Sequence, residues 1–305
     1  MNIVPGSSTA YRKHGDEAGL ARAEGKRTIL NKVVFYEDTL MNHVKQTGAI
    51  EEVEEEALRR EEFQVYLQPK YQYDRSHAKI VGAEALVRWI DANGKCKSPM
   101  EFIPVFEANG FIYKLDCFMW EMVCKVIRRW LDTGRQPLPI SVNVSRTYLQ
   151  KEDVAGYIKN LIDKYQIPME LFQLEITETT ENAESLSYIN SLKQAGFTLL
   201  MDDFGSGYSS LCMLKNTPFD VLKMDRQFLD ECLDSKQGKT IISHVISMSN
   251  DLGLSIIAEG VENRGTADFL YDNGCSVSQG FYFSKPVSIP EFEHMLDEQQ
   301  TEQQR

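Results

Sequence analysis

The chain has few of the residues that build zinc sites or disulfide frameworks. Its six cysteines form no Cys-x-x-Cys pair and show no zinc-like spacing, so we expect ordinary thiols in a reducing compartment. The five histidines are scattered, which argues against a histidine-rich metal centre. Any metal site is therefore expected to use oxygen ligands, the donors that Mg²⁺ and Mn²⁺ prefer.

The chain also lacks an excess of basic residues and long apolar runs. Its formal net charge of −12 argues against DNA or RNA polymers as partners, because proteins that follow a phosphate backbone usually carry a basic face. A small phosphate-bearing ligand, held by metal ions and a few local cations, remains compatible with this charge. No uninterrupted apolar stretch is long enough to span a bilayer, and residues 1–8 lack the features of a secretory signal. We therefore expect a cytoplasmic protein with no membrane segment.

The composition predicts one large domain with short flanking segments. Residues 1–49 are mostly polar, and residues 50–62 are expected to form an acidic linker helix, since seven of the twelve residues from 51 to 62 are Glu. Residues 63–297 contain the apolar runs needed for a core, within a chain that is 42% hydrophobic. The polar, low-complexity segment 298–305 is expected to be a disordered tail.

The main domain alternates short apolar runs with helical patterns, which predicts an α/β fold. Eight strands separated by helices over roughly 240 residues match a (β/α)₈ TIM-like barrel. A doubly wound open sheet is the competing fold, but no Gly-x-Gly-x-x-Gly turn follows the first strand. The predicted strands are 63–67, 80–87, 140–144, 172–177, 198–202, 221–224, 255–258 and 276–283. The predicted helices are 118–131, 153–165, 184–195, 237–252 and 264–273.

Two adjacent acids, Asp202 and Asp203, end one of these strands. Neighbouring carboxylates resist joint ionisation, and a divalent cation between them removes that cost. Successive strand residues point to opposite faces, so we expect both acids to converge where the Gly-rich loop after them breaks the pleat. The alternative is a solvated turn in which these acids cap the next helix.

Other polar residues occupy the ends of the remaining predicted strands. They are Glu84, Asn143, Glu175, Lys223, Glu259 and Gln279. Each has a simpler interpretation: Glu84 could pair with Arg88, for example, and Lys223 could point outward. Together they favour one site, because the working residues of a barrel lie at the C-terminal ends of its strands. Several carboxylates and one amide oxygen suit two hard cations about 3.5–4 Å apart, with Lys223 stabilising developing charge or orienting a water.

Five sequence motifs resemble those of the EAL-domain cyclic di-GMP phosphodiesterases. They are Glu84-Ala-Leu-Val-Arg-Trp89, Asp202-Asp-Phe-Gly-Ser-Gly-Tyr-Ser-Ser-Leu211, Lys223-Met-Asp225, Glu259-Gly-Val-Glu262 and Gln279-Gly-Phe-Tyr-Phe-Ser-Lys-Pro286. The resemblance extends from about Phe63 to Pro286. A second Glu-Ala-Leu string, at Glu56, lies inside the acidic helix and carries no such context.

The resemblance implies a two-metal site that hydrolyses cyclic di-GMP to linear pGpG. The ligands that it implies are Glu84, Asn143, Glu175 and Asp202 for the first metal, and Asp202, Asp203 and Glu259 for the second. It makes Lys223 the residue that positions the water, with support from Gln279. It makes Glu178 the anchor of the loop after Asp203, near the family's homodimer contact. The substrate contacts that it implies are Gln68, Leu86, Arg88, Asp225 and Gln279.

The departures from the family pattern are small, and every implied metal ligand is present. Ser206 stands where Thr is common, and Met224 where an aliphatic β-branched residue is usual. A complete ligand set favours an enzyme, while a cyclic di-GMP receptor that does not cut its ligand and a dimerising scaffold are the alternatives.

The N-terminal segment has a second resemblance. Residues 16–26 and 34–36 are similar to the last helix and strand of a GGDEF domain, which often precedes an EAL domain. The chain has no Gly-Gly-Asp-Glu-Phe string, so we do not expect cyclase activity. A linker without such an origin is the alternative for residues 1–49.

Overall fold

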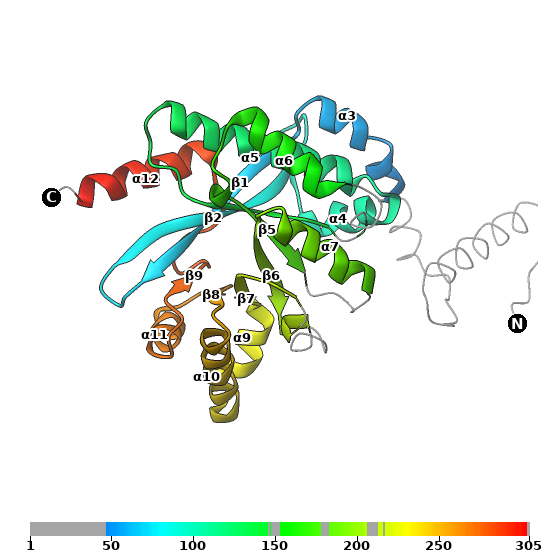
Figure 1. Ribbon diagram of the computed structural model, residues 1–305. Helices are drawn as coiled ribbons and strands as arrows, with labels where there is room; N and C mark the ends of the chain where they lie inside the picture. The colour runs from blue at the N-terminus through cyan, green and yellow to red at the C-terminus, as the bar shows by residue number, and fades with distance from the viewer. Residues whose placement is uncertain are drawn as a thin grey trace, which may run out of the picture.

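The computed structural model describes residues 47–145, 147, 153–177, 183–205, 213–215 and 217–303 (Figure 1). The GGDEF-like segment up to residue 46 lies outside the described residues, as do Glu178 and the loop 206–211.

Eight strands close into a barrel, which confirms the predicted fold class. Around the barrel the strands follow one another in the order β1, β9, β8, β7, β6, β5, β4 and β2, and β2 pairs again with β1. The strands are β1 (Phe63–Tyr73), β2 (Ala78–Ile90), β4 (Ile140–Asn143), β5 (Phe172–Thr177), β6 (Thr198–Phe204), β7 (Val221–Met224), β8 (Ser255–Ala258) and β9 (Val277–Ser278). Two short strands, β3 (Cys96–Lys97) and β10 (Val287–Ser288), pair with β2 and β1 outside this ring.

The first strand departs from a regular (β/α)₈ barrel. β1 runs antiparallel to both of its barrel neighbours, β2 and β9, whereas the other neighbouring barrel strands are parallel. The chain reverses between β1 and β2 within a few residues, because one oxygen of Asp74 accepts hydrogen bonds from the backbone N–H groups of Ser76 and His77. A connection this short has no room for the helix that an alternating pattern predicts.

The described helices lie around the outside of the barrel (Figure 1). They are α3 (Glu54–Arg59), α4 (Pro99–Asn109), α5 (Ile112–Asp132), α6 (Val154–Tyr165), α7 (Ala183–Gln194), α9 (Arg226–Leu233), α10 (Lys236–Asp251), α11 (Arg264–Asp272) and α12 (Ile289–Gln303), with a 3₁₀ turn, η1 (Met169–Leu171). The five predicted helices correspond to α5, α6, α7, α10 and α11. The prediction missed α4, α9 and α12.

The C-terminal helix differs from its prediction. α12 continues through Gln303, into the segment 298–305 that was expected to be a disordered tail. Its Gln299 side chain exchanges two hydrogen bonds with the backbone of Ile80, at 2.6 and 3.2 Å. These contacts tie the end of the helix to β2, and composition alone does not reveal them.

The inward-facing residues of the barrel form an apolar layer beneath a polar one. Leu200, Val221 and Ile257 form a small buried cluster, against which Val277 packs. Side chains two residues apart on a strand share a face, so the next inward positions belong to Asp202, Lys223, Glu259 and Gln279. The larger core, which includes three fully buried tryptophans, packs the outside of the barrel against the helices. The strand period therefore places these polar residues at one end of the barrel.

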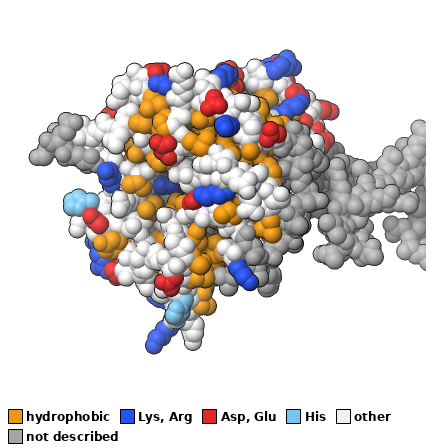
Figure 2. Space-filling view, viewed as in Figure 1, with side chains coloured by type: hydrophobic (Ala, Val, Ile, Leu, Met, Phe, Trp, Pro, Cys, Tyr) orange, Lys and Arg blue, Asp and Glu red, His pale blue; other side chains and the backbone are white. Residues whose placement is uncertain are grey.

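Charge on the visible surface and the character of the described helices bear on the possible partners of the chain. On the face shown in Figure 2, acidic and basic side chains are interspersed, and neither sign gathers into one large patch. Within the described part of the chain, none of the helices combines the length and the apolar character that crossing a membrane requires.

Candidate metal centre and active site

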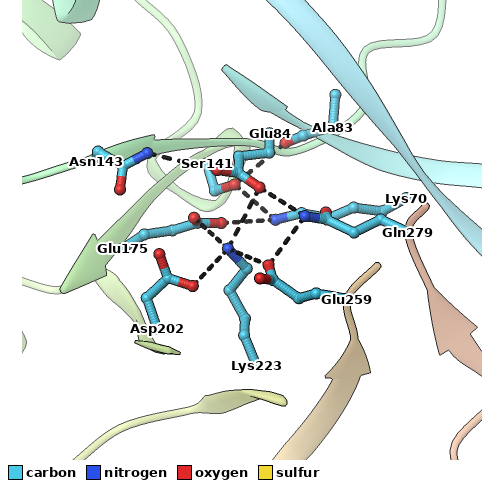
Figure 3. Close-up of polar contacts among 10 residues, drawn as sticks. All are labelled: Lys70, Ala83, Glu84, Ser141, Asn143, Glu175, Asp202, Lys223, Glu259 and Gln279. Carbon is cyan, nitrogen blue, oxygen red and sulfur yellow. Dashed lines mark hydrogen bonds and ion pairs between the residues drawn. The ribbon is translucent and has the colours of Figure 1, made fainter. Parts of the chain in front are cut away.

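The centre of the site is the ammonium group of Lys223, which is surrounded by carboxylates from β2, β5, β6 and the residue after β8 (Figure 3). Its Nζ lies 2.5 Å from Glu175 Oε2, 2.6 Å from Glu259 Oε1 and 2.8 Å from Asp202 Oδ1. Glu84 Oε2 is the fourth partner, at 3.3 Å. The Lys223 side chain is 1% exposed. The interpretation of Lys223 as an outward-pointing lysine is therefore wrong.

One ammonium group does not neutralise this cluster. Burial, with the charges of neighbouring acids added to it, raises the pKa of Glu84 and of Asp202, and raises the pKa of Glu259 well above its usual value. Burial opposes the charge of Lys223, but the surrounding carboxylates raise its pKa well above the ordinary value. The raised pKa values of Glu84, Asp202 and Glu259 show that the positive charge of Lys223 does not balance the negative charge of these acids.

A second buried lysine, Lys70, was not found from the sequence. Its Nζ donates to Ser141 Oγ at 2.6 Å and to Glu175 Oε1 at 3.0 Å. Burial alone would raise the pKa of Glu175, but the charges of Lys223 and Lys70 outweigh burial and hold that pKa at about 2. The strand period gives part of the signal, because Lys70 lies two residues after Gln68 and hence on the same face, but its depth in the barrel depends on the antiparallel course of β1.

Asp202 and Asp203 converge by a break within β6. Asp203 has a φ of +58°, and the pairing of β6 with β7 shifts register between Met201 and Phe204. This left-handed residue lets oxygens of the two acids and of Glu259 come within 4.8 Å of one another. The break therefore lies at Asp203 itself and not only in the Gly-rich loop to which it was assigned. Strained backbone of this kind is often found at functional sites.

The donors at this end of the barrel fit divalent cations. Five carboxylates face two lysines, Lys70 and Lys223, so the formal charge of the group is 2 − 5 = −3; the acids are Glu84, Glu175, Asp202, Asp203 and Glu259. Gln279 Nε2 donates to Glu84 Oε2 at 2.7 Å and to Glu259 Oε1 at 2.9 Å. Its Oε1 is buried and has no hydrogen-bond partner among the described residues. Oxygen donors with unbalanced negative charge suit a hard cation.

Asn143 and Asp225 lie closer to the edge of this group. Asn143 is exposed, and its Nδ2 lies 3.5 Å from Glu84 Oε1, which keeps its amide within reach of the cluster. Asp225 accepts hydrogen bonds from the backbone N–H groups of Gln227 and Phe228 and so caps α9. The structure therefore gives Asp225 a helix-capping contact, while Glu178 lies outside the described residues.

Two cavities flank the acidic group. A cavity of about 450 Å³ lies between the end of β2 and helices α4 and α5, and Leu86, Arg88 and Asp203 are among its lining residues. A second cavity, of about 250 Å³, is lined by Leu86 together with Gln68 and Gln279. Leu86 thus borders both spaces. An elongated ligand can extend to both sides of the carboxylates.

The simpler interpretation, in which Glu84 pairs with Arg88, is wrong. Arg88 Nη1 donates to the backbone carbonyl of Val87, and the Arg88 guanidinium lies 5.7 Å from the centre of the Tyr66 ring. The oxygens of Glu84 are contacted by Lys223, Gln279 and Asn143. Arg88 therefore keeps a guanidinium at the larger cavity, where it can meet a ligand.

A closed α/β barrel with buried carboxylates and lysines gathered at one end is the arrangement of a barrel enzyme, whose working residues lie at one end of the strands. The family model for the EAL domain matches residues 51–286. The chain belongs to the EAL domain family, as its sequence motifs predict.

Known relatives agree with this assignment. The chain is 34% identical to signaling protein YkoW of Bacillus subtilis, over 97% of this chain and 37% of that protein. It is 30% identical to cyclic di-GMP phosphodiesterase NbdA of Pseudomonas aeruginosa, over 97% of this chain and 38% of that protein. The chain thus spans about two fifths of the length of these relatives.

Solved structures show the same fold. The PaMucR phosphodiesterase in its c-di-GMP complex superposes with a TM-score of 0.74 at 30% identity, covering 80% of this chain and 99% of that one. The EAL enzyme Bd1971 in a cAMP-bound form gives a TM-score of 0.76 at 26% identity, covering 85% of this chain and 71% of that one.

Proposed function

We propose that this chain hydrolyses cyclic di-GMP to linear pGpG with the help of two Mg²⁺ or Mn²⁺ ions. The observation that carries the proposal is the position of Lys223 among four carboxylates, next to the Asp202, Asp203 and Glu259 oxygens that lie within 4.8 Å of one another. Membership of the EAL family and the names of the phosphodiesterase relatives support the choice of substrate.

Each of the site residues has its own proposed role. Asp202, Asp203 and Glu259 would hold one cation, and Glu84, Asn143, Glu175 and Asp202 would hold the other. When bound, such cations acidify a water and neutralise charge on a phosphodiester. Lys223 orients the attacking water and stabilises the negative charge that develops on the phosphate. Gln279 keeps Glu84 and Glu259 in place through its two hydrogen bonds.

The two cavities suit the two halves of a cyclic dinucleotide. The phosphodiester to be cut lies over the acidic group, and one base extends to each side, past Leu86. Arg88, in the larger cavity, offers a planar fork to a phosphate or a base edge, while Gln68 and Gln279 offer amides in the smaller one. Asp225 is proposed as a further substrate contact; it also caps α9, and its charge adds to the burial that raises the pKa of Asp203.

We also propose that residues 63–297 form the catalytic unit and that residues 50–62 link it to preceding domains. We further propose that the unit forms a homodimer whose contact lies near the loop that Glu178 anchors. The greater length of the relatives supports a place in larger signalling proteins. Sedimentation at several protein concentrations, with and without Mg²⁺, tests the dimer: a monomer at every concentration would refute it.

Chromatography of cyclic di-GMP incubated with the purified chain tests the activity. Linear pGpG should appear with Mg²⁺ or Mn²⁺, and should not appear with EDTA or in Glu84→Ala. Glu231→Ala, which removes an exposed carboxylate of α9, serves as the matched control and should leave the product unchanged. Binding of cyclic di-GMP without product in any tube would support the receptor alternative instead, and neither binding nor product would support the scaffold.

A further inference from the structure

We propose that Lys70 is a positioning residue for the metal site: it holds Glu175 Oε1 and leaves Oε2 as the only oxygen of Glu175 available to a cation. This inference rests on the proposed function. The two oxygens of Glu175 have different partners, Lys70 at 3.0 Å from Oε1 and Lys223 at 2.5 Å from Oε2 (Figure 3).

The antiparallel course of β1 explains how Lys70 reaches this place. In the pairing with β2, Gln68 lies opposite Glu84 and Lys70 lies opposite Gly82. Lys70 is therefore one inward-facing position farther from the open end of the barrel than Glu84. A Cβ on Gly82 would lie 3.0 Å from the Pro139 carbonyl oxygen and 4.0 Å from Lys70 Cδ. A side chain at Gly82 would therefore crowd the Pro139 backbone, while it would meet the stem of Lys70 at an ordinary van der Waals distance.

The two lysines differ in their freedom to release Glu175. Lys223 has three other carboxylate partners, so it can give up its contact with Glu175 Oε2 and stay paired. Among the described residues, Lys70 forms its ion pair with Glu175, and Ser141 Oγ is its other hydrogen-bond acceptor. Lys70 is only 4% exposed, and a buried ammonium that loses its carboxylate is strongly disfavoured. Lys70 therefore keeps Oε1 whatever occupies the site.

Two consequences follow for the chemistry. Glu175 binds a cation through a single oxygen in a fixed direction, because its carboxylate cannot rotate without breaking the Lys70 contact. Lys223 also does not have to neutralise Glu175 alone, which leaves its ammonium free to serve the reacting groups. Hydrogen-bond partners of metal ligands typically contribute about 10- to 100-fold to metal affinity.

The test measures binding of Mn²⁺ alone to the full chain by isothermal titration calorimetry, without nucleotide. Lys70→Met keeps the length of the side chain and removes the charge, and we expect Mn²⁺ affinity to fall about 10- to 100-fold. Lys193→Met is the matched control, because Lys193 also pairs with one acid, Asp220, but away from the site. It should bind Mn²⁺ like the wild type.

A double-mutant cycle separates positioning from a general structural role. If Lys70 acts through Glu175, adding Lys70→Met to Glu175→Gln should weaken Mn²⁺ binding no further. A further loss in the double variant would overturn the proposal, as would unchanged or tighter Mn²⁺ binding by folded Lys70→Met.

Folding and activity controls keep the outcomes distinct. Circular dichroism checks each variant, and Lys70→Gln, which keeps a hydrogen-bond donor, replaces Lys70→Met in the same comparison if the latter does not fold. A wild type that binds Mn²⁺ and forms pGpG, with no effect of Lys70 substitution, would refute only the role of Lys70. A wild type that neither binds Mn²⁺ nor forms pGpG would refute the proposed function and this inference together.

Discussion

Lys223 Nζ lies 2.5 Å from Glu175 Oε2, and both side chains are almost completely buried. The contact joins β7 to β5 across the barrel, so it cannot be a local pairing of neighbouring residues. Such a buried pair is stable only while both charges are present, because either partner alone is an uncompensated charge in a poorly solvated place. Three more carboxylates share the same ammonium, which makes Lys223 important to stability as well as to the proposed chemistry.

Removing the charge of Lys223 should therefore affect activity and stability together. We expect Lys223→Met to lower kcat for cyclic di-GMP by about 10²- to 10³-fold, the range typical of removing one group that stabilises developing charge. Without metal, its free energy of unfolding should fall by about 3–5 kcal/mol, since four acids lose their shared cation. Initial rates and urea unfolding measure the two effects. A kcat within twofold of wild type would contradict the role given to Lys223.

Metal removal should lower the thermal stability of the chain. Cations at 100 times their dissociation constant stabilise a folded protein by about 2.7 kcal/mol, which corresponds to a rise in Tm of roughly 4 °C for a chain of this size. We expect Mn²⁺ to raise Tm and EDTA to reverse the change, as followed by scanning calorimetry. Asp202→Asn should abolish the rise, and Asp251→Asn, at an exposed position of α10, should retain it. An equal rise in both variants would place the binding of Mn²⁺ elsewhere.

Much of the barrel and most of the acidic group could be predicted because both follow the strand period. The positions of Asp202, Lys223, Glu259 and Gln279 follow from the end of an apolar run, and parallel strands bring such ends together. Lys70 was missed because β1 runs antiparallel, so its inward residues enter the barrel in the reverse order. That direction depends on the pairing of β1 with β2, which only the three-dimensional structure reveals.

The other missed features have local causes. α9 has eight residues, too few for a clear apolar period, and its start depends on the cap by Asp225. β9 has two residues, so the predicted run 276–283 was much too long. After Ser278 the chain turns away at Gly280, whose backbone lies against that of Val261. Short elements such as these are set by tertiary contacts more than by sequence pattern.

The positive φ of Asp203 should lower the free energy of unfolding, and a glycine at this position should remove that penalty. Both Asp203→Gly and Asp203→Ala remove a proposed metal ligand and should lose hydrolysis. Glycine adopts a φ of +58° without a Cβ clash, so Asp203→Gly should exceed Asp203→Ala in free energy of unfolding by about 1 kcal/mol. At Ser255, an exposed β8 residue outside the positive-φ group, the order of the Gly and Ala variants should reverse. Urea unfolding without metal measures all four variants, and equal stability of the two Asp203 variants would contradict the strain.

Gly280 should tolerate no side chain, and its substitution should disturb Gln279 next to it. A Cβ at Gly280 would lie 2.3 Å from both the N and the O of Val261, which are backbone atoms that cannot move aside cheaply. We expect Gly280→Ala to lower the free energy of unfolding by about 2–4 kcal/mol, from overpacking and an unfavourable φ combined. The hydrogen bonds of Gln279 to Glu84 and Glu259 should loosen, so that kcat falls at saturating Mn²⁺ even where the protein is folded.

Gly94 provides the matched comparison for that prediction. It also has a positive φ, +78°, but a Cβ there would meet no atom within 4 Å. Gly94→Ala should therefore cost only the backbone term, about 1–2 kcal/mol, and should leave kcat unchanged. Urea unfolding and initial rates of the two variants separate the clash from the backbone strain. If both variants lose the same stability and keep full kcat, the close approach of Gly280 to Val261 has no part in holding Gln279 in the site.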